Sequence, residues 1–380
     1  MKKYKIILLM ILIVIFPLLT GCWDRVEMED RAFVLGIGLD KGEKKDEIAL
    51  TYQIAIPSAM FGEGGGGGGE KQFLNLTATA RSIIRADKQL LTRVNKTLNN
   101  EHTYVLIIGE DLAKEGISSH IDYFLRDIDM RRRTNVLVAE GKAQDYFKYM
   151  PPIAKSTSDY LSKIIELNEK RVHRISSRVD ILEMAKNLRR ETDFILQKIV
   201  QDKDGITMAG AGVFKKDKLI GYLSPDDVRK VKWLKNDISQ GTIELMDVDG
   251  IKGLTVLEIS EGRTQVKPRI YEENVDFDVN IRLEGDIVEM ESMNFDRTVS
   301  KEFINVLEKK VEEKVKKECS EIMRKAQDEF KADFFDFGHL VKNYNIRWWK
   351  QHEKEWRDIF KQSKLNVKVD VNIRRVGLIE

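Results

Sequence analysis

Ala32-Phe33-Val34-Leu35-Gly36-Ile37-Gly38-Leu39-Asp40, residues 32–40, is the apolar stretch with which the water-soluble body of the chain begins. In the next apolar run every second residue is hydrophobic, and this alternation predicts a half-buried β-strand. Asp40-Lys41-Gly42-Glu43 joins the two runs and is rich in turn-forming residues. The two runs therefore predict a β-hairpin. The apolar face of the second strand consists of Ile48, Leu50, Tyr52, Ile54 and Ile56, and Pro57 ends it.

Upstream of this hairpin lies Leu18-Leu19-Thr20-Gly21-Cys22-Trp23-Asp24, preceded by three lysines (Lys2, Lys3, Lys5) and an apolar run from 6 to 19. Leu-Thr-Gly-Cys is a lipobox, the cleavage signal of bacterial lipoproteins. Small residues let a peptidase close around the bond, and the thiol is then alkylated with diacylglycerol. We predict that residues 1–21 are a signal peptide, cleaved between Gly21 and Cys22, and that 22–31 form a lipidated, charged tether.

Two other interpretations account for part of this segment. A plain secretory signal has similar basic and apolar regions but needs no cysteine at the cut. An uncleaved anchor needs about 20 apolar residues, whereas this run is shorter and contains Pro17. Two or more acyl chains, at about 0.8 kcal/mol per buried methylene, give stable anchoring. The lipoprotein interpretation therefore predicts a body tethered to the outer face of a membrane.

Composition narrows the partners of that body. The chain has 380 residues, enough for two or three domains, and carries 64 Lys and Arg against 62 Asp and Glu. Removing the three signal lysines leaves 61 basic residues and a net charge near −1. This argues against nucleic acid as a partner, and it removes any electrostatic case for binding anionic headgroups with the body. After lipidation of Cys22 only Cys319 remains, so an intrachain disulfide is excluded, and its place on an apolar helical stripe favours burial.

The middle of the chain predicts alternating helices and strands. Apolar residues recur at helical spacing from Thr77 to Asn99, and a continuous apolar run at 104–108 predicts a strand covered on both faces. Further helices at 109–125 and a strand at 136–139 indicate α/β layers over about 77–150. Pro151-Pro152 then breaks the chain, and helical segments are expected through roughly Ile199.

A second unit is predicted to begin near Gly205 with a hairpin over 207–223, followed by a helix that Ser224-Pro225-Asp226-Asp227 starts. Strands are expected at 254–259, 264–270, 275–283 and 367–373. The longest helix is predicted at about 300–333, where apolar residues repeat at steps of three and four. Trp348, Trp349 and Trp356 follow it, and core packing is favoured for them over a ligand platform.

Motifs for catalysis or metal binding are missing from the sequence. The glycines at 62–69 lack the Lys and Ser or Thr of a phosphate-binding loop, and an exposed flexible loop is favoured. Gly36-Ile37-Gly38 fails the dinucleotide pattern because Lys41 occupies a glycine position. Asp333, Asp336 and His339 are interspersed with phenylalanines, which favours a packed helix terminus over a metal site. We expect the arginine triplet at 131–133 to pair with Asp127, Asp129 and Glu140 rather than with a ligand.

The order of these segments resembles the Ger(x)C family of spore germination lipoproteins, the C subunits of nutrient germinant receptors. The resemblance covers essentially the whole mature chain, and the glycine tract is an expansion outside the pattern. It is carried by the stretches 21–27, 34–40, 105–117, 124–127 and 333–338, together with His102, Arg131, the three tryptophans and residues 374–377.

The resemblance implies an α+β protein of three domains, each a β-sheet packed with α-helices. Our boundaries are 32–200 for an N-terminal α/β domain, 205–252 for a middle domain and 253–380 for a C-terminal domain. It also implies a non-catalytic subunit without cofactor or metal. Cys22 would hold this subunit on the outer face of the spore's inner membrane, beside a membrane-embedded A subunit and a transporter-like B subunit.

Two further functions remain open at this stage. A lipid-anchored solute-binding protein would deliver a nutrient to a transporter, although the sequence lacks the repeat expected of two similar lobes. A lipid-anchored surface enzyme is the third possibility, and the absence of a catalytic motif counts against it. The nutrient, and whether this chain contacts it, do not follow from the sequence.

Overall fold

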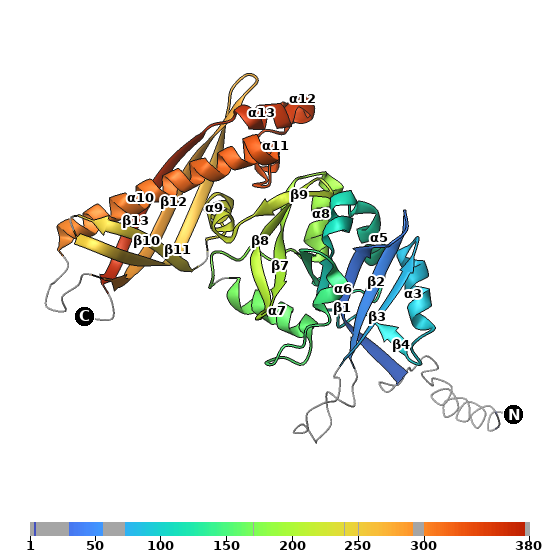
Figure 1. Cartoon of the computed structure of the whole chain (residues 1–380). Coiled ribbons are helices and arrows are strands. Elements are labelled where there is room, and N and C mark those ends of the chain that lie inside the picture. The colour runs from blue at the N-terminus through green and yellow to red at the C-terminus, as the bar shows by residue number, and fades with distance from the viewer. Residues whose placement is uncertain are drawn as a thin grey trace.

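The computed structural model describes residues 4, 30–55, 73–169, 171–238, 240–249, 251–291 and 300–376 (Figure 1). Two β-sheets packed with helices make up this part of the chain, so the predicted α+β class is confirmed. The predicted signal peptide apart from Tyr4, together with Cys22 and the glycine tract at 62–69, lies outside the described residues. The domain boundaries stay predictions.

The first sheet has nine strands in the described part of the chain, in the order β3-β2-β1-β5-β6-β7-β8-β9, with β4 beside the start of β1. Its parallel centre is formed by β1, β5, β6 and β7, and the flanking strands are antiparallel. The strands are β1 (Arg31–Lys41), β2 (Ile48–Ala55), β3 (Phe73–Ala80), β4 (Thr97–Asn99), β5 (Val105–Ile108), β6 (Asn135–Ala139), β7 (Phe194–Asp202), β8 (Gly205–Lys215) and β9 (Lys218–Leu223).

Helices cover both faces of this sheet, and each face has its own apolar core. One face packs against α3 (Ile83–Leu91), α4 (Glu110–Glu115), α5 (Ser118–Arg126) and α8 (Ile181–Arg190). The other packs against α6 (Ala143–Tyr146) and α7 (Thr157–Asn168). β1 lies close to the helices of this second layer. A Cβ added to Gly36 would lie 2.1 Å from the Ser158 hydroxyl oxygen, which leaves no room for a side chain. The glycines of β1 therefore serve helix packing.

The predicted hairpin is confirmed as β1 and β2, which pair antiparallel from Lys41–Ile48 to Val34–Ile54. The prediction of a half-buried strand is wrong, since all eight residues of β2 are buried. Its polar residues find partners inside the protein. The Thr51 hydroxyl lies 2.9 Å from that of Thr77, and the Gln53 side-chain oxygen accepts from the backbone N–H of Ser158 at 3.0 Å. These two polar side chains can be buried without a large loss of stability because they are hydrogen-bonded.

Two predicted helical stretches are corrected by the structure. Residues 77–99 contain the end of β3, the short helix α3 and β4, because 73–80 pairs with β2 in the sheet. β3 ends at Ala80, and Ser82 caps α3 by accepting the backbone N–H of Arg85. Residues 194–199, expected to continue a helical region, form β7 with β8 as its partner. Both strands depend on pairing with distant residues, which local periodicity does not report.

The second sheet has the order β10-β11-β12-β13 and lies at the far end of the molecule from the start of β1 (Figure 1). The two strands predicted at 254–259 and 264–270 are one long strand, β11. The long helix α10 crosses the sheet and continues into a π-helical turn at Lys325–Phe330. The elements are α9 (Pro225–Lys235), β10 (Gly241–Val248), β11 (Ile251–Ile270), β12 (Val275–Met290), α10 (Lys301–Arg324), α11 (Phe337–Tyr344), α12 (Ile346–His352), α13 (Trp356–Gln362) and β13 (Leu365–Val376).

A buried ion pair joins α9 to α10. Arg229 and Glu318 lie 2.7 Å apart with side chains only 10% and 8% exposed. The second carboxylate oxygen of Glu318 accepts from the Trp233 indole N–H at 2.8 Å. Ser224 starts α9 with a capping box, as its sequence predicts. Apolar side chains of β7, β8 and β9 share one core with α9, α10 and the second sheet, so the two sheets are joined by continuous packing.

We predict that Glu318→Ala lowers the free energy of unfolding by about 3–5 kcal/mol. It leaves the buried Arg229 guanidinium with only the exposed Asp226 at 3.9 Å, and it removes the acceptor of the Trp233 indole N–H. Glu321→Ala is the matched control, since Glu321 is on the same helix and pairs with Lys230 at 2.9 Å but is 33% exposed. That change should cost about 1 kcal/mol or less. Urea denaturation of the purified proteins measures both, and equal losses would contradict the assignment.

Candidate functional site

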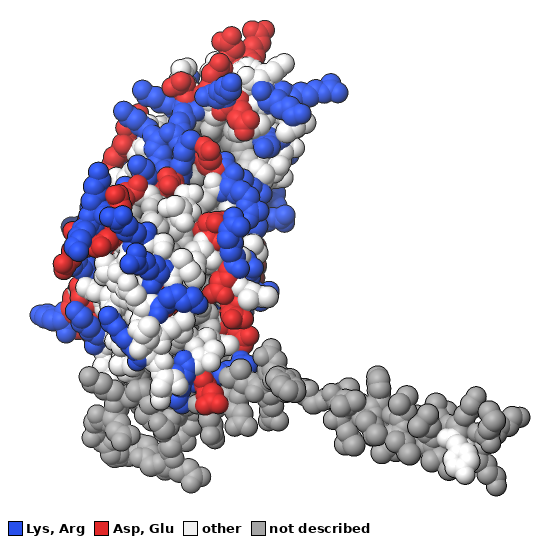
Figure 2. Space-filling model, turned by 90° about the vertical axis from the view of Figure 1, so that its right-hand side faces the viewer, with Lys and Arg blue, Asp and Glu red and all other residues white. Residues whose placement is uncertain are grey.

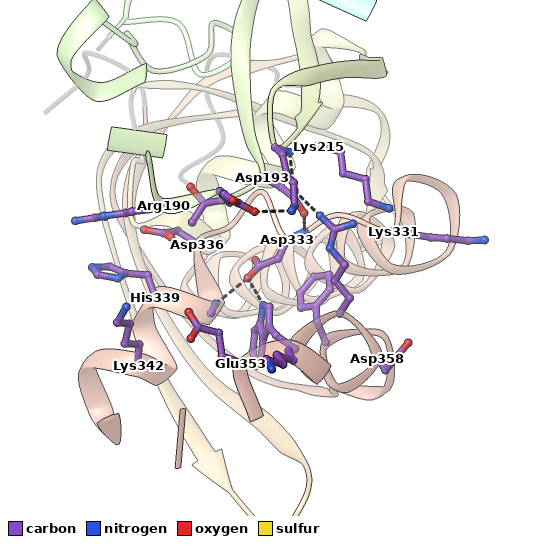
Figure 3. Close-up of a pocket in the computed structure, with 18 of the residues that line it drawn as sticks. Arg190, Asp193, Lys215, Lys331, Asp333, Asp336, His339, Lys342, Glu353 and Asp358 are labelled. Carbon is purple, nitrogen blue, oxygen red and sulfur yellow. Dashed lines mark hydrogen bonds and ion pairs between the residues drawn. The ribbon is translucent and has the colours of Figure 1, made fainter. Parts of the chain in front are cut away.

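A cleft of about 910 Å³ lies where the first sheet meets the C-terminal helices (Figure 3). Its walls come from the segment between α8 and β7, the β8–β9 turn, and residues 327–361. Segments more than a hundred residues apart in the sequence therefore line one cavity. In Figure 3, Asp193 and Asp333 lie at its centre, whereas Lys331 and Lys342 extend away from them on opposite sides.

Asp193, directly before β7, connects the two walls of the cleft. One carboxylate oxygen accepts the backbone N–H of Lys216 at 3.0 Å, and the other accepts that of Asp333 at 3.1 Å. The Arg357 guanidinium lies 3.4 Å from the Asp193 carboxylate and forms an ion pair with it. Burial raises the pKa of this carboxyl, while Arg357 and the two N–H groups oppose the change. Asp193 therefore ties the first sheet to the C-terminal part of the chain through two donors, the Asp333 N–H and Arg357, while Lys216 belongs to the first sheet itself.

Asp333 organises the turn that leads into α11. Its carboxylate accepts the N–H groups of Phe337 at 3.1 Å and Gly338 at 2.7 Å, and the Trp356 indole N–H at 3.0 Å. Asp336 has a left-handed backbone with φ of 67°, which lets the chain reverse into the helix. A side chain at position 338 would collide with Trp356, since an added Cβ lies 2.8 Å from its indole nitrogen. The predicted packed helix terminus is what the structure contains.

The three C-terminal tryptophans belong to the core, as predicted. Trp349 and Trp356 have ring centroids 5.3 Å apart, and both line the cleft. Trp348 stacks on His352 at 4.2 Å and donates its indole N–H to the carbonyl of Glu272. The Trp349 indole nitrogen is buried without an acceptor among the described residues. Trp349 and Trp356 therefore form part of the cleft wall and also pack in the apolar core.

The acidic side chains of the cleft are largely engaged in contacts within the chain. The carboxylates of Asp193 and Asp333 are occupied by donors of the chain itself, and Glu191 pairs with Lys216 at 2.5 Å. Lysines and arginines from several elements line the rim, among them Arg190, Lys215 and Lys342. Within the described ranges no group of three His, Cys, Asp or Glu side chains is placed to hold a metal ion. No described helix is long and apolar enough to cross a membrane.

The structure describes only some of the residues that the sequence singled out. Gly21 and Cys22 lie outside the described residues, so cleavage and lipidation stay predictions. Cys319 is fully buried in α10, and burial raises the pKa of its thiol. Two members of the expected ion pairs around the arginine triplet have other partners. Arg132 donates to the backbone carbonyl of Leu125, and Glu140 pairs with Lys198. Sequence reasoning missed the contact of Asp193 with Arg357, since no local pattern links residues 164 positions apart.

Comparison with known proteins assigns the chain to a class. A family model described as the spore germination protein N-terminal domain matches residues 24–201, and one described as spore germination B3/GerAC like, C-terminal, matches residues 209–377. In Bacillus subtilis (strain 168), spore germination protein KC is 27% identical over 99% of this chain and 97% of its own length. Spore germination protein YndF from the same organism is 26% identical over 95% and 94%.

A solved structure has the same fold. The crystal structure of the GerBC protein superposes with a TM-score of 0.60 over 89% of this chain and 97% of that chain, at 22% identity. These matches define a spore germination protein with the N- and C-terminal domains of that class. The chain belongs to the Ger(x)C family, as the resemblance in its sequence indicated, and has a role in spore germination.

We predict a pH dependence at Asp333. Burial raises the pKa of this carboxyl from 3.8 to about 6, against the opposing effect of its N–H donors. Because the folded chain then binds the proton more tightly than the unfolded chain, the stability from this group is present at low pH and lost as pH rises. The loss between about pH 4 and pH 6 amounts to roughly 3 kcal/mol.

Asp333→Asn cannot titrate, so wild type should lose stability relative to this variant across that pH range in urea denaturation. Asp358→Asn, an exposed carboxyl change on the same cleft, is the control and should follow wild type. Curves of wild type and Asp333→Asn that stay parallel from about pH 4 to pH 7 would show that Asp333 has an ordinary pKa.

Proposed function

We propose that this protein is a lipid-anchored, non-catalytic subunit of a nutrient germinant receptor and acts by assembly with the membrane-embedded A and B subunits. Cys22 holds it on the outer face of the spore's inner membrane. The observation that carries the proposal is the match of both halves of the chain to spore germination domains, combined with the lipobox that precedes them.

The described residues support an assembly role. The polar groups concentrated in the cleft hold the two walls together through Asp193 and Asp333. A body joined by continuous packing presents its surfaces in one arrangement, which suits a subunit that docks on partners. Confinement to the membrane plane by the lipid raises the effective concentration of the subunit around its partners without any new contact.

One observation favours the alternative of a solute-binding protein, namely the cleft of about 910 Å³ between two parts of the body. Its volume is within the range of small-molecule sites. Against it, the two sheets differ in size and strand order, whereas solute-binding proteins usually have two similar lobes. The mixed charges of the rim also select no single nutrient class.

Cys22→Ala should leave the precursor unlipidated and remove the chain from the membrane fraction of spores. Co-purification with the A and B subunits should fall with it, and germination in response to nutrient should slow. Cys319→Ala is the matched control, because it removes the other cysteine of the chain and keeps the lipobox. Normal receptor levels and full germination in the Cys22→Ala strain would refute the role of the anchor.

The two candidate functions differ in their response to nutrients. We predict that amino acids, sugars and nucleosides leave the melting temperature of the purified protein unchanged. A solute-binding protein saturated at about 100 times its Kd would gain about 2.7 kcal/mol and melt several degrees higher. Differential scanning fluorimetry measures this, and a large shift with one nutrient class would favour the alternative.

A further inference from the structure

One edge of the first sheet collects the starts of three of its parallel strands, β1, β5 and β6. Val105 of β5 pairs with Gly36 of β1, and Asn135 of β6 pairs with Val105, so β1, β5 and β6 begin at the same edge. The short strand β4 extends this edge by pairing with residues 31–33. β2 runs antiparallel to β1 and therefore ends at this edge. β3 runs antiparallel to β2 and therefore begins there. We call this the N-terminal edge.

The anchor enters the body at the N-terminal edge. β1 begins at Arg31, nine positions after Cys22. At about 3.3–3.6 Å per residue, a lipid on Cys22 holds this edge within roughly 30 Å of the bilayer. Figure 1 shows the second sheet and α10 at the opposite end of the molecule from the start of β1. The tether therefore ensures proximity to the membrane for this end of the body.

Two loops at this edge expose large apolar side chains. Ile128 is 91% exposed, and the residue before it is fixed by a 3.0 Å hydrogen bond from Asn100, directly after β4. Ile153 is 84% exposed and Met150 is 50% exposed. Their loop leaves the body at Phe147, whose carbonyl accepts from Asn75 near the start of β3. Both loops are held by the edge while their tips are in water.

The two loops flank opposite faces of the sheet. Met130, two residues after Ile128, is buried in the core on the α3 and α5 face. Phe147, three residues before Met150, is buried in the core on the α6 and α7 face. Exposed tips on both sides of one edge can meet a flat surface together. A protein partner would be expected to bury a contiguous patch of about 800 Å², whereas these tips are separated by the thickness of the sheet.

Charge around the tips is compatible with lipid headgroups. Arg131 and Arg133 are exposed beside Ile128, and Lys155 lies next to Ile153 on the other loop. Asp127 and Asp129 offset part of this charge, so attraction is modest. The near-zero net charge of the body does not report such local arrangements of charge. On the face that Figure 2 shows, Lys and Arg are interspersed with Asp and Glu.

We propose that the N-terminal edge lies on the phospholipid bilayer, with Ile128 on one loop and Met150 and Ile153 on the other inserted at headgroup depth. Apolar residues flanked by Lys and Arg insert about 5–10 Å into this region. The body then stands on the membrane and the second sheet projects away from it. This inference rests on the proposed lipid anchor and adds an orientation to it.

The cysteine content of the chain allows a direct test. Lipidation consumes Cys22 and Cys319 is fully buried, so one introduced cysteine can be labelled selectively with an environment-sensitive NBD dye. Ile128→Cys and Ile153→Cys place the dye on the two loops. Tyr344→Cys is the matched control, because Tyr344 is 66% exposed but belongs to α11, away from the N-terminal edge. All three sites are exposed, so folding should be unaffected, and melting curves check this.

The lipidated full-length variants are reconstituted into phosphatidylcholine vesicles containing phosphatidylglycerol. We expect NBD emission at 128 and 153 to shift to the blue and to fall to about half or less when the lipids carry shallow spin labels. Emission at 344 should remain that of a dye in water. Adding Arg131→Gln and Arg133→Gln should reduce the shift at 128, since fewer cations face the headgroups.

Flotation separates the two possible failures. Protein that does not float with the vesicles refutes the lipid anchor and hence the proposed function. Protein that floats with its dyes at 128 and 153 in water overturns the bilayer contact alone. Protection of these dyes only after membrane-embedded receptor subunits are added also overturns it, because the edge would then face protein.

Discussion

Burial of β1 on both faces is the constraint on which the first sheet depends. A strand covered on each side needs neighbours for its backbone and helices for both layers, and the chain provides them from distant segments. β2 and β5 pair with its two sides, and the helices that follow them cover its faces. Gly36 and Gly38 lack side chains where α7 and Phe147 come closest. The close approach explains these glycines without a nucleotide.

Buried carboxylates hold the rest of the body to this sheet. Glu318 joins α10 to α9, Asp193 joins the start of β7 to the C-terminal helices, and Asp333 shapes the turn before α11. Each is surrounded by donors, as a carboxylate removed from water must be. The cleft lies between these connections. Its polar groups are mainly structural, which agrees with a protein that positions surfaces for other subunits.

The membrane attachment and the membrane contact that we propose are encoded in different ways. The lipobox is a local signal that a peptidase reads in an extended chain. The N-terminal edge combines loops from 127–134 and 147–156, and neither loop is distinctive as sequence. The net charge near −1 of residues 22–380 does not bear on this contact, because a sum over the body carries no information about where the charges lie.

Elements with a strong local pattern could be predicted from the sequence, namely the β1–β2 hairpin, the helix that Ser224 starts and the long amphipathic helix. The family resemblance and the expected burial of Cys319 and the tryptophans also followed from residues alone. Strands β3 and β7 could not be recognised, because their stability comes from partners far along the chain. Only the tertiary structure brought Asp193 to Arg357 and Asp333, and only it placed Ile128 and Ile153 on loops near the start of β1. Local patterns report which face of an element is apolar, whereas packing decides which distant side chains meet.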